Sequence, residues 1–157
     1  SDLDRRHVCR APHPRWGRLG GAPGRARRPA QNDPFEIADI YNIHVSIEPL
    51  PAHIGGFYTL IFDYAYIVIN SNKTFEWQKA ICAHELGHAL LHNQDHAFLA
   101  MNDFVTQSKL EREANRFAAT LLIGEEKPHE GETIYEFSKR VSIPVEFLKS
   151  LGKDELM

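Results

Sequence analysis

Apolar and polar residues alternate along residues 57–62 and 64–70, and both stretches are rich in aromatic and β-branched side chains. A period of two is typical of a β-strand with one buried face. Only Asp63 separates the stretches, so they predict a β-hairpin that turns near this residue. Residues 44–48 form a shorter run before a proline-rich break and predict a further strand. Together these patterns predict a short antiparallel sheet.

A longer period, close to 3.6 residues, marks two later segments and predicts helices. Residues 75–92 contain no proline and one glycine, and they follow a polar break at residues 70–74 that offers several N-cap side chains. One face of this helix would carry Trp77, Ala80, Ile81, His84, His88 and Leu91. Residues 108–123 show the same period, and residues 93–107 are expected to form a loop or short helix that lines a cleft.

Shorter helical patterns lie at the two ends of this region. Asp33-Pro34 is typical of a helix start, and residues 133–151 contain two helical patterns broken by a proline, as in a helix-turn-helix. A DNA-reading helix would be basic, but the second pattern offers only Lys149 against Glu146. We therefore interpret this segment as a helical cap that completes the core or docks a partner. The predicted class is α+β, with helices packed on a short sheet and a C-terminal helical cap.

Charge divides the chain near residue 31. Residues 1–30 hold eight arginines, no lysine and two aspartates, a charge of +6, whereas the remainder carries −9 and brings the total to −3. We predict that residues 1–31 are a disordered basic tail. A basic arm can bind nucleic acid. The loss of arginine in favour of lysine after residue 31 instead favours a solvated tail or a segment foreign to the domain.

The remaining composition is that of one globular domain. The 157 residues are 43% hydrophobic, which suffices for a core. No apolar run approaches the length of a membrane span, and no signal-peptide pattern opens the chain. Cys9 and Cys82 lie far apart, one in the tail and one in a predicted helix. We therefore expect no disulfide and a reducing, cytoplasmic setting.

Residues 84–88 read His-Glu-x-x-His within the first long helix. Residues four apart lie about 40° from each other around an α-helix, so His84 and His88 leave one face one turn apart. That separation suits two ligands of one tetrahedral Zn²⁺. Glu85 points to the side of the metal, where it can act as a general base toward water. Two core histidines bonded to backbone carbonyls are the plainer alternative, and we interpret His92, one turn later, as a structural or supporting residue.

A catalytic zinc keeps three protein ligands and one open position, so a third ligand must come from elsewhere. The extended motif with a third histidine fails, because Gln94 occupies that position. In the second long helix, Glu111 and Glu113 flank the apolar face on opposite sides, and periodicity does not choose between them. Ser108 and Glu111 would form a capping box without any metal. Against this, Asn115 lies one turn after Glu111, where it would orient a ligand histidine.

Residues 83–92 and 111–122 together resemble the ImmA/IrrE family of metallo-endopeptidases, which typically read HELGH and then E-x-(E/Q)-A-(N/D)-x-F-A-x-x-LL. The strand region at residues 56–70 also fits, and the resemblance covers roughly residues 33–150. The first motif occurs in many zincins, but the pair in this order is much more specific. One departure is Ile123-Gly124, which stands where the family usually has Met-Pro.

The resemblance implies a zincin-like metallopeptidase domain over residues 32–128, with a C-terminal helical segment at residues 129–157 and Zn²⁺ as cofactor. It implies that the zinc ligands are His84, His88 and Glu111 and that the general base is Glu85. Glu111 is preferred because the family tolerates Gln at the position of Glu113. In zincins the neighbouring strand edge pairs with an extended substrate. Three tyrosines of the hairpin are expected to be packing residues, and a hydrogen bond from one of their hydroxyls to the tetrahedral oxyanion is the alternative, which the sequence does not assign to any one of them: Tyr58, Tyr64 and Tyr66.

The expected function is that of a zinc-dependent endopeptidase. The resemblance implies that its protein substrate is a helix-turn-helix repressor of a phage or mobile element, cleaved in the cytoplasm. An alternative is a zinc-containing regulatory or antitoxin-type binding partner with little turnover. A third is a DNA-associated module that uses the basic arm, although direct nucleic-acid binding is not the expected role. No membrane partner is expected.

Overall fold

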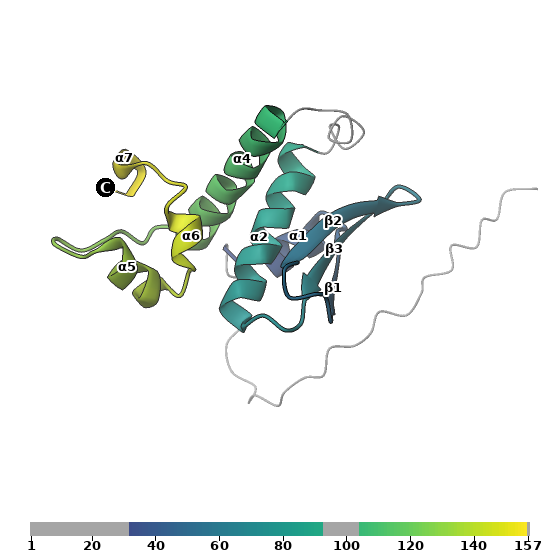
Figure 1. The fold of residues 1–157 in the computed structure, drawn as a ribbon, viewed down its shortest axis with the longest axis horizontal. Coiled ribbons are helices and arrows are strands. Elements are labelled where there is room, and N and C mark those ends of the chain that lie inside the picture. The colour runs from purple at the N-terminus through teal and green to yellow at the C-terminus, as the bar shows by residue number, and fades with distance from the viewer. Residues whose placement is uncertain (1–31, 93–103, 157) are drawn as a thin grey trace, which may run out of the picture.

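The computed structural model describes residues 32–92 and 104–156 (Figure 1). The predicted basic tail and residues 93–103 lie outside the described residues. Within these ranges the chain forms three strands and six helices, which confirms the α+β class. No described helix combines the length and the apolar character that crossing a lipid bilayer requires.

The sheet consists of β1 (His44–Glu48), β2 (Gly56–Ile61) and β3 (Tyr64–Asn70) in the order β1-β3-β2. β2 and β3 form the predicted hairpin. Its turn residues Phe62 and Asp63 both adopt left-handed backbone angles, with φ of 49° and 64°. Two successive positive φ values match the right-handed twist of the paired strands, which explains the tight connection.

The sheet is mixed, so the prediction of an antiparallel sheet was wrong in one respect. β2 runs antiparallel to β3, with Tyr58 opposite Ile67, but β1 runs parallel to β3, with His44 opposite Tyr66. Alternation predicts where strands lie, but it does not carry the direction in which a distant strand joins the sheet. Parallel pairing requires the chain to cross over between β1 and β2.

Asn70 stabilises that crossover. Its side chain is fully buried, and its amide nitrogen donates to the carbonyl oxygens of Leu50, Pro51 and Ile54 at 3.2, 3.1 and 2.8 Å. Its amide oxygen accepts from the Leu50 backbone at 3.3 Å. The last residue of β3 thereby fixes the loop that leads into β2, and this loop brings β2 to the outer edge.

Four helices follow the predicted patterns closely. Asp33 caps α1 (Pro34–Ile40), and Thr74 caps α2 (Phe75–Leu91), so Thr74 is the cap among the several candidates. Near the C-terminus, α5 (Ile134–Val141) and α6 (Val145–Leu148) are the two short helices that the proline break predicted.

The other two helices extend the pattern. α4 (Phe104–Ile123) begins four residues before the predicted start at residue 108. A short α7 (Lys153–Leu156) follows α6. In Figure 1, α4 lies beside α2, with the sheet on one side of this pair and the C-terminal helices on the other.

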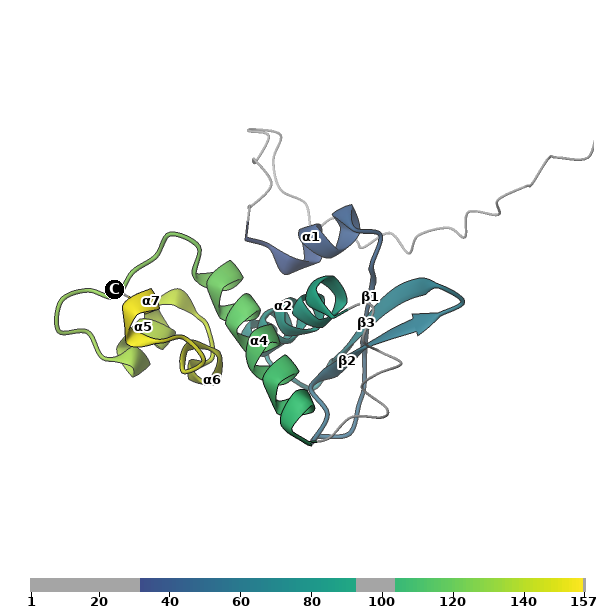
Figure 2. The same ribbon diagram turned by 90° about the horizontal axis from the view of Figure 1, so that it is seen from above.

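Figure 2 shows α2 surrounded by α1, α4 and the sheet. Two apolar cores pack against α2. Toward the sheet it contributes Ile81, Cys82, Leu86 and Ala89. Toward α4 and the C-terminal helices it contributes Ala80 and Ala83, which pack in a core that also holds Phe137 and Leu148. α2 is therefore buried on several sides, more than the predicted single stripe, and Leu91 of that stripe is 52% exposed.

Candidate metal centre

α2 presents His84 and His88 to a cleft from neighbouring turns. Their Nε2 atoms lie 3.1 Å apart, and their rings meet nearly at right angles, with centroids 4.7 Å apart. Both side chains are largely buried, at 15% and 11% exposed. The helical spacing that the sequence predicted therefore brings two imidazole nitrogens to one point.

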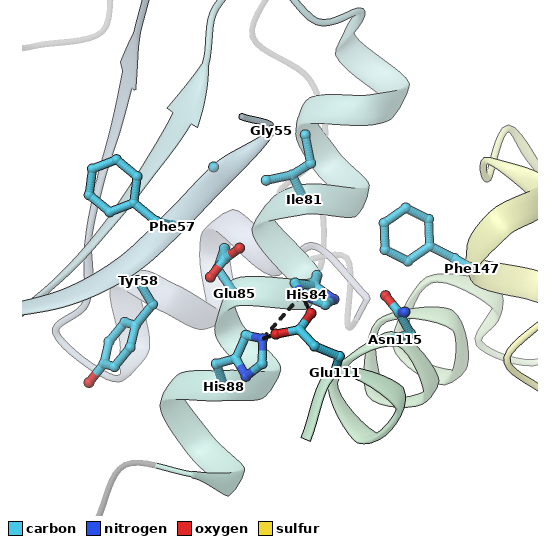
Figure 3. A pocket seen from close by; sticks show the side chains of 11 residues that line it. Gly55, Phe57, Tyr58, Ile81, His84, Glu85, His88, Glu111, Asn115 and Phe147 are labelled. Atoms are coloured by element: carbon cyan, nitrogen blue, oxygen red, sulfur yellow. Dashed lines mark hydrogen bonds and ion pairs between the residues drawn. The ribbon is translucent and has the colours of Figure 1, made fainter. Parts of the chain in front are cut away.

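α4 supplies a carboxylate to the same point (Figure 3). Glu111 places Oε2 3.2 Å from His84 Nε2 and Oε1 3.1 Å from His88 Nε2. Glu113 instead contacts His92, at 2.9 Å between Oε2 and Nε2. Of the two glutamates that periodicity left open, Glu111 is the one that reaches both histidines.

The capping-box interpretation of Glu111 was wrong. Because α4 begins at Phe104, Ser108 lies inside the helix, and its hydroxyl accepts from Arg112 at 3.2 Å. Nothing at this helix position needs an N-cap. The carboxylate of Glu111 is instead bound to the two histidines.

The three donor groups fit a small transition-metal ion. Tetrahedral ligands at about 2.0–2.1 Å from zinc lie about 3.3–3.4 Å from one another. The nitrogen–nitrogen and nitrogen–oxygen separations among His84, His88 and Glu111 are 3.1–3.2 Å, close to this tetrahedral edge. Two imidazoles and a carboxylate are also a donor set that binds zinc and related divalent metals.

Gly87 allows α2 and α4 to approach closely enough for this contact. A Cβ atom at Gly87 would lie 3.0 Å from a ring carbon of Phe117 and 3.2 Å from the Cα of Ala114. A side chain here would push α4, and Glu111 with it, away from the histidines. The glycine of the sequence motif therefore sets the distance between the two helices.

The residues of the cluster shift one another's pKa values. Hydrogen bonds from His84 and His88 hold the pKa of Glu111 well below its ordinary value, although its side chain is half exposed. Burial alone would lower the pKa of His84, but its hydrogen bond to Glu111 and the charges of Glu85 and Glu111 outweigh burial and raise it. Asn115, one turn after Glu111, points toward the His84 ring (Figure 3), and its side chain also raises this pKa.

Glu85 lies beside the cluster and points toward β2 (Figure 3). It is only 8% exposed, and burial raises the pKa of its carboxyl group. A hydrogen bond with the Tyr58 backbone and the nearby charges of His84 and His88 act in the opposite direction but do not cancel the effect of burial. A carboxylate with a raised pKa, held in a cleft, is suited to accept a proton.

The cleft at the cluster has a volume of about 530 Å³. One wall is formed by Gly55 and the first three residues of β2, and another by Ile81 of α2 and Phe147 of α6. The Phe147 ring lies 6.2 Å from the His84 ring in an edge-to-face arrangement. Sequence reasoning missed Phe147, because nothing in its local pattern indicates which distant residue it contacts.

The three hairpin tyrosines do not supply a hydroxyl to the cluster. Tyr66 stacks on His44, and Tyr64 is 62% exposed at the hairpin turn. Tyr58 lines the cleft, but its hydroxyl points away from His84 and His88 (Figure 3). The backbone of Tyr58 forms a hydrogen bond with Glu85.

Comparison with known proteins agrees with this geometry. The sequence pattern that defines the IrrE N-terminal-like domain matches residues 38–149. "Uncharacterized immunity region protein 2" of Bacillus phage phi105 is 40% identical over 93 residues, which cover 59% of each chain. "Metallopeptidase ImmA" of Bacillus subtilis (strain 168) is 33% identical over 112 residues, which cover 69% of this chain and 64% of that relative.

The chain thus aligns with about three fifths of the length of these two curated relatives. The matched residues include α2 and α4, so they include every side chain of the candidate metal centre. The motif pair, the His-His-Glu geometry and the sequence match agree, and the chain belongs to the IrrE N-terminal-like domain family.

Proposed function

We propose that this chain is a zinc-dependent endopeptidase. The observation that carries the proposal is the convergence of His84, His88 and Glu111 in a cleft that also holds the buried carboxylate of Glu85. Three ligands leave one position of a tetrahedral site open, which is typical of catalytic rather than structural zinc. The name of the Bacillus subtilis relative, a metallopeptidase, supports the same activity.

Zinc bound by His84, His88 and Glu111 would supply Lewis acidity, which lowers the pKa of water and polarises a carbonyl group. Glu85 takes a proton from the water as its oxygen bonds to the scissile carbonyl carbon. Glu85 then gives that proton to the leaving amine nitrogen as the carbon–nitrogen bond breaks. The raised pKa of Glu85 suits both transfers, because it lets the group hold the proton between them.

The edge of β2 is the proposed place for the substrate backbone. β2 pairs with β3 on one side, and no other strand of the described residues pairs with its outer edge. Gly55 and Gly56 line the cleft at the start of this edge and have no side chains to obstruct an extended peptide. An added strand would carry the scissile bond past Glu85 and the histidines.

The proposed substrate is a helix-turn-helix repressor of a phage or mobile element. Support comes from the family resemblance and from the similar immunity region protein of a Bacillus phage. Such a repressor acts on the chromosome, so the proposed setting is the cytoplasm.

The test uses the purified full chain, loaded with one equivalent of Zn²⁺, and the repressor encoded beside it. Cleavage is followed by mass spectrometry for the wild type and for Glu85→Gln, with repressor binding and metal content measured in parallel. The wild type should cleave at one site. Glu85→Gln should bind zinc and repressor normally but cleave at least about 100-fold more slowly, as is typical when a general base is lost.

Two results would count against the peptidase. Wild type that binds the repressor without cleaving it would favour the regulatory binding partner instead. Equal cleavage by wild type and Glu85→Gln would remove Glu85 from the mechanism and point to a contaminating protease.

A further inference from the structure

His92 lies directly behind the metal centre, on the side of His88 that faces away from the cleft. Its side chain is 3% exposed, and its Nδ1 lies 3.2 Å from Nδ1 of His88. His92 is the C-cap of α2, and its backbone N–H donates to the carbonyl of His88 at 3.0 Å. This hydrogen bond closes the last turn of the helix and holds the two rings one turn apart.

Glu113 completes this arrangement from α4. Its Oε2 lies 2.9 Å from Nε2 of His92, and its Oε1 lies 3.8 Å from the ammonium of Lys109. An ionised carboxylate only accepts hydrogen bonds, so the Nε2 atom of His92 must donate to Glu113. A neutral His92 then has no proton on Nδ1, and that atom accepts.

The acceptor at His92 Nδ1 determines the proton position on His88. His88 Nδ1 carries a hydrogen that it donates to His92, which leaves the lone pair of a neutral His88 ring on Nε2. Nε2 is the atom that faces His84 and Glu111. The carboxylate of Glu113 therefore selects, through His92, the form of His88 that can bind a metal.

We propose that His92 and Glu113 are positioning residues that hold His88 in its metal-binding tautomer. This inference rests on the proposed zinc site. It gives different roles to the two glutamates of α4. Glu111 is a metal ligand, whereas Glu113 is connected to the ligand His88 through two hydrogen bonds, by way of His92. Partners of this kind typically change metal affinity by 10- to 100-fold when they are removed.

The zinc affinity of the full chain tests this inference, measured by competition with a chromophoric chelator. His92→Phe keeps a ring of similar size but lacks both nitrogens, and Glu113→Leu keeps much of the volume but lacks the acceptor. Both should bind Zn²⁺ about 10- to 100-fold more weakly than wild type. Glu113→Gln retains an acceptor oxygen and should stay within about threefold of wild type.

The matched control is Arg112→Leu, which places the same leucine on the exposed side of the same helical turn and should leave zinc affinity unchanged. Glu113 is 42% exposed, so Glu113→Leu is expected to fold even if His92→Phe does not. Nitrogen-15 NMR of the histidine rings provides a second measurement. Zinc-loaded wild type should carry the His92 proton on Nε2, and Glu113→Leu should lose this preference.

The outcomes separate this inference from the proposed function. Wild type that fails to bind zinc would overturn the proposed metal centre itself. Wild type that binds zinc, with unchanged affinity in Glu113→Leu, would overturn only the role of Glu113 and His92. Equal losses in Glu113→Gln and Glu113→Leu would show that the charge of Glu113 matters rather than its acceptor, and a His92 proton on Nδ1 would overturn the proton assignment.

Discussion

Glu85 in the metal centre and Glu132 beside the C-terminal helices are the same residue type, but the fold shifts their pKa values in opposite directions. Burial in α2 raises the pKa of Glu85. Glu132 precedes α5, where hydrogen bonds from the Arg140 guanidinium lower its pKa to about 2. The first carboxylate is costly to ionise, whereas the second is stabilised as an anion.

The surroundings of the two glutamates explain this difference. Arg140 also donates to Glu126 at 3.0 Å and to the carbonyl of Lys127 at 2.7 Å. These hydrogen bonds stabilise the segment that connects α4 to α5. In the metal centre, by contrast, burial is the largest influence on the pKa of Glu85, and His84 Nδ1 is buried with no hydrogen-bond partner among residues 32–92 and 104–156. Matched charges stabilise structure, whereas incompletely matched ones mark the site of chemistry.

Removing one carboxylate from the metal centre and one from the Arg140 group should give the largest difference in zinc binding. Glu111→Ala deletes a proposed ligand, and we expect zinc affinity to fall by more than the 10- to 100-fold that outer partners typically contribute. Glu132→Ala removes a carboxylate of the Arg140 group and should bind one zinc as wild type does. Metal content after gel filtration, with chelator competition, measures both variants. Full zinc binding by Glu111→Ala would exclude Glu111 as a ligand.

A second contrast uses two glycines. Gly87→Val places a branched side chain against Phe117 and Ala114, and we expect a loss of about 2–3 kcal/mol in unfolding free energy from overpacking. Gly152→Val is the matched control, since a Cβ there would meet only the flexible end of Glu155 at 3.7 Å. Urea unfolding measures both. Equal stability of the two variants would show that α4 can move away from α2 without cost.

Local sequence signals predicted most element boundaries, because caps, proline breaks and periodicity act within a few residues. Asp33, Thr74 and the break before Val145 lie where these signals indicated. The parallel pairing of β1 with β3 was not predictable in this way. It depends on Asn70 and its contacts with residues about 16–20 positions away, which no local period reveals.

The metal centre was also predictable only where its residues lie on one element of secondary structure. Spacing alone brought His84 and His88 together, because both lie on one helix. Periodicity does not choose between Glu111 and Glu113, because the choice depends on how α4 packs against α2, including the close approach at Gly87. Phe147 reaches the cleft only because the C-terminal helices fold back onto α2 and α4.

The smallest effect, and the sharpest test of the difference between Glu85 and Glu132, comes from replacing each of the two with glutamine. The raised pKa of Glu85 means that its ionisation destabilises the fold as pH rises above 4.5, so metal-free Glu85→Gln should be more stable than wild type at pH 7. The lowered pKa of Glu132 has the opposite sign. Its stabilisation is present above pH 4.5 and is lost as pH falls toward 2, so Glu132→Gln should be slightly less stable at pH 7.

Thermal unfolding of the metal-free proteins between pH 2 and pH 8 measures both differences from wild type, because this range includes the lowered pKa of Glu132, which is about 2. The Glu85→Gln difference should disappear below pH 4.5, where wild-type Glu85 is protonated and resembles glutamine. The Glu132→Gln difference should shrink as pH falls from 4.5 toward 2, because Glu132 stays ionised in the folded state until the pH reaches its pKa. Opposite signs at pH 7 that converge at low pH would tie the stability changes to ionisation. Differences of the same sign, or differences that persist in acid, would mean that packing rather than charge distinguishes the two glutamates.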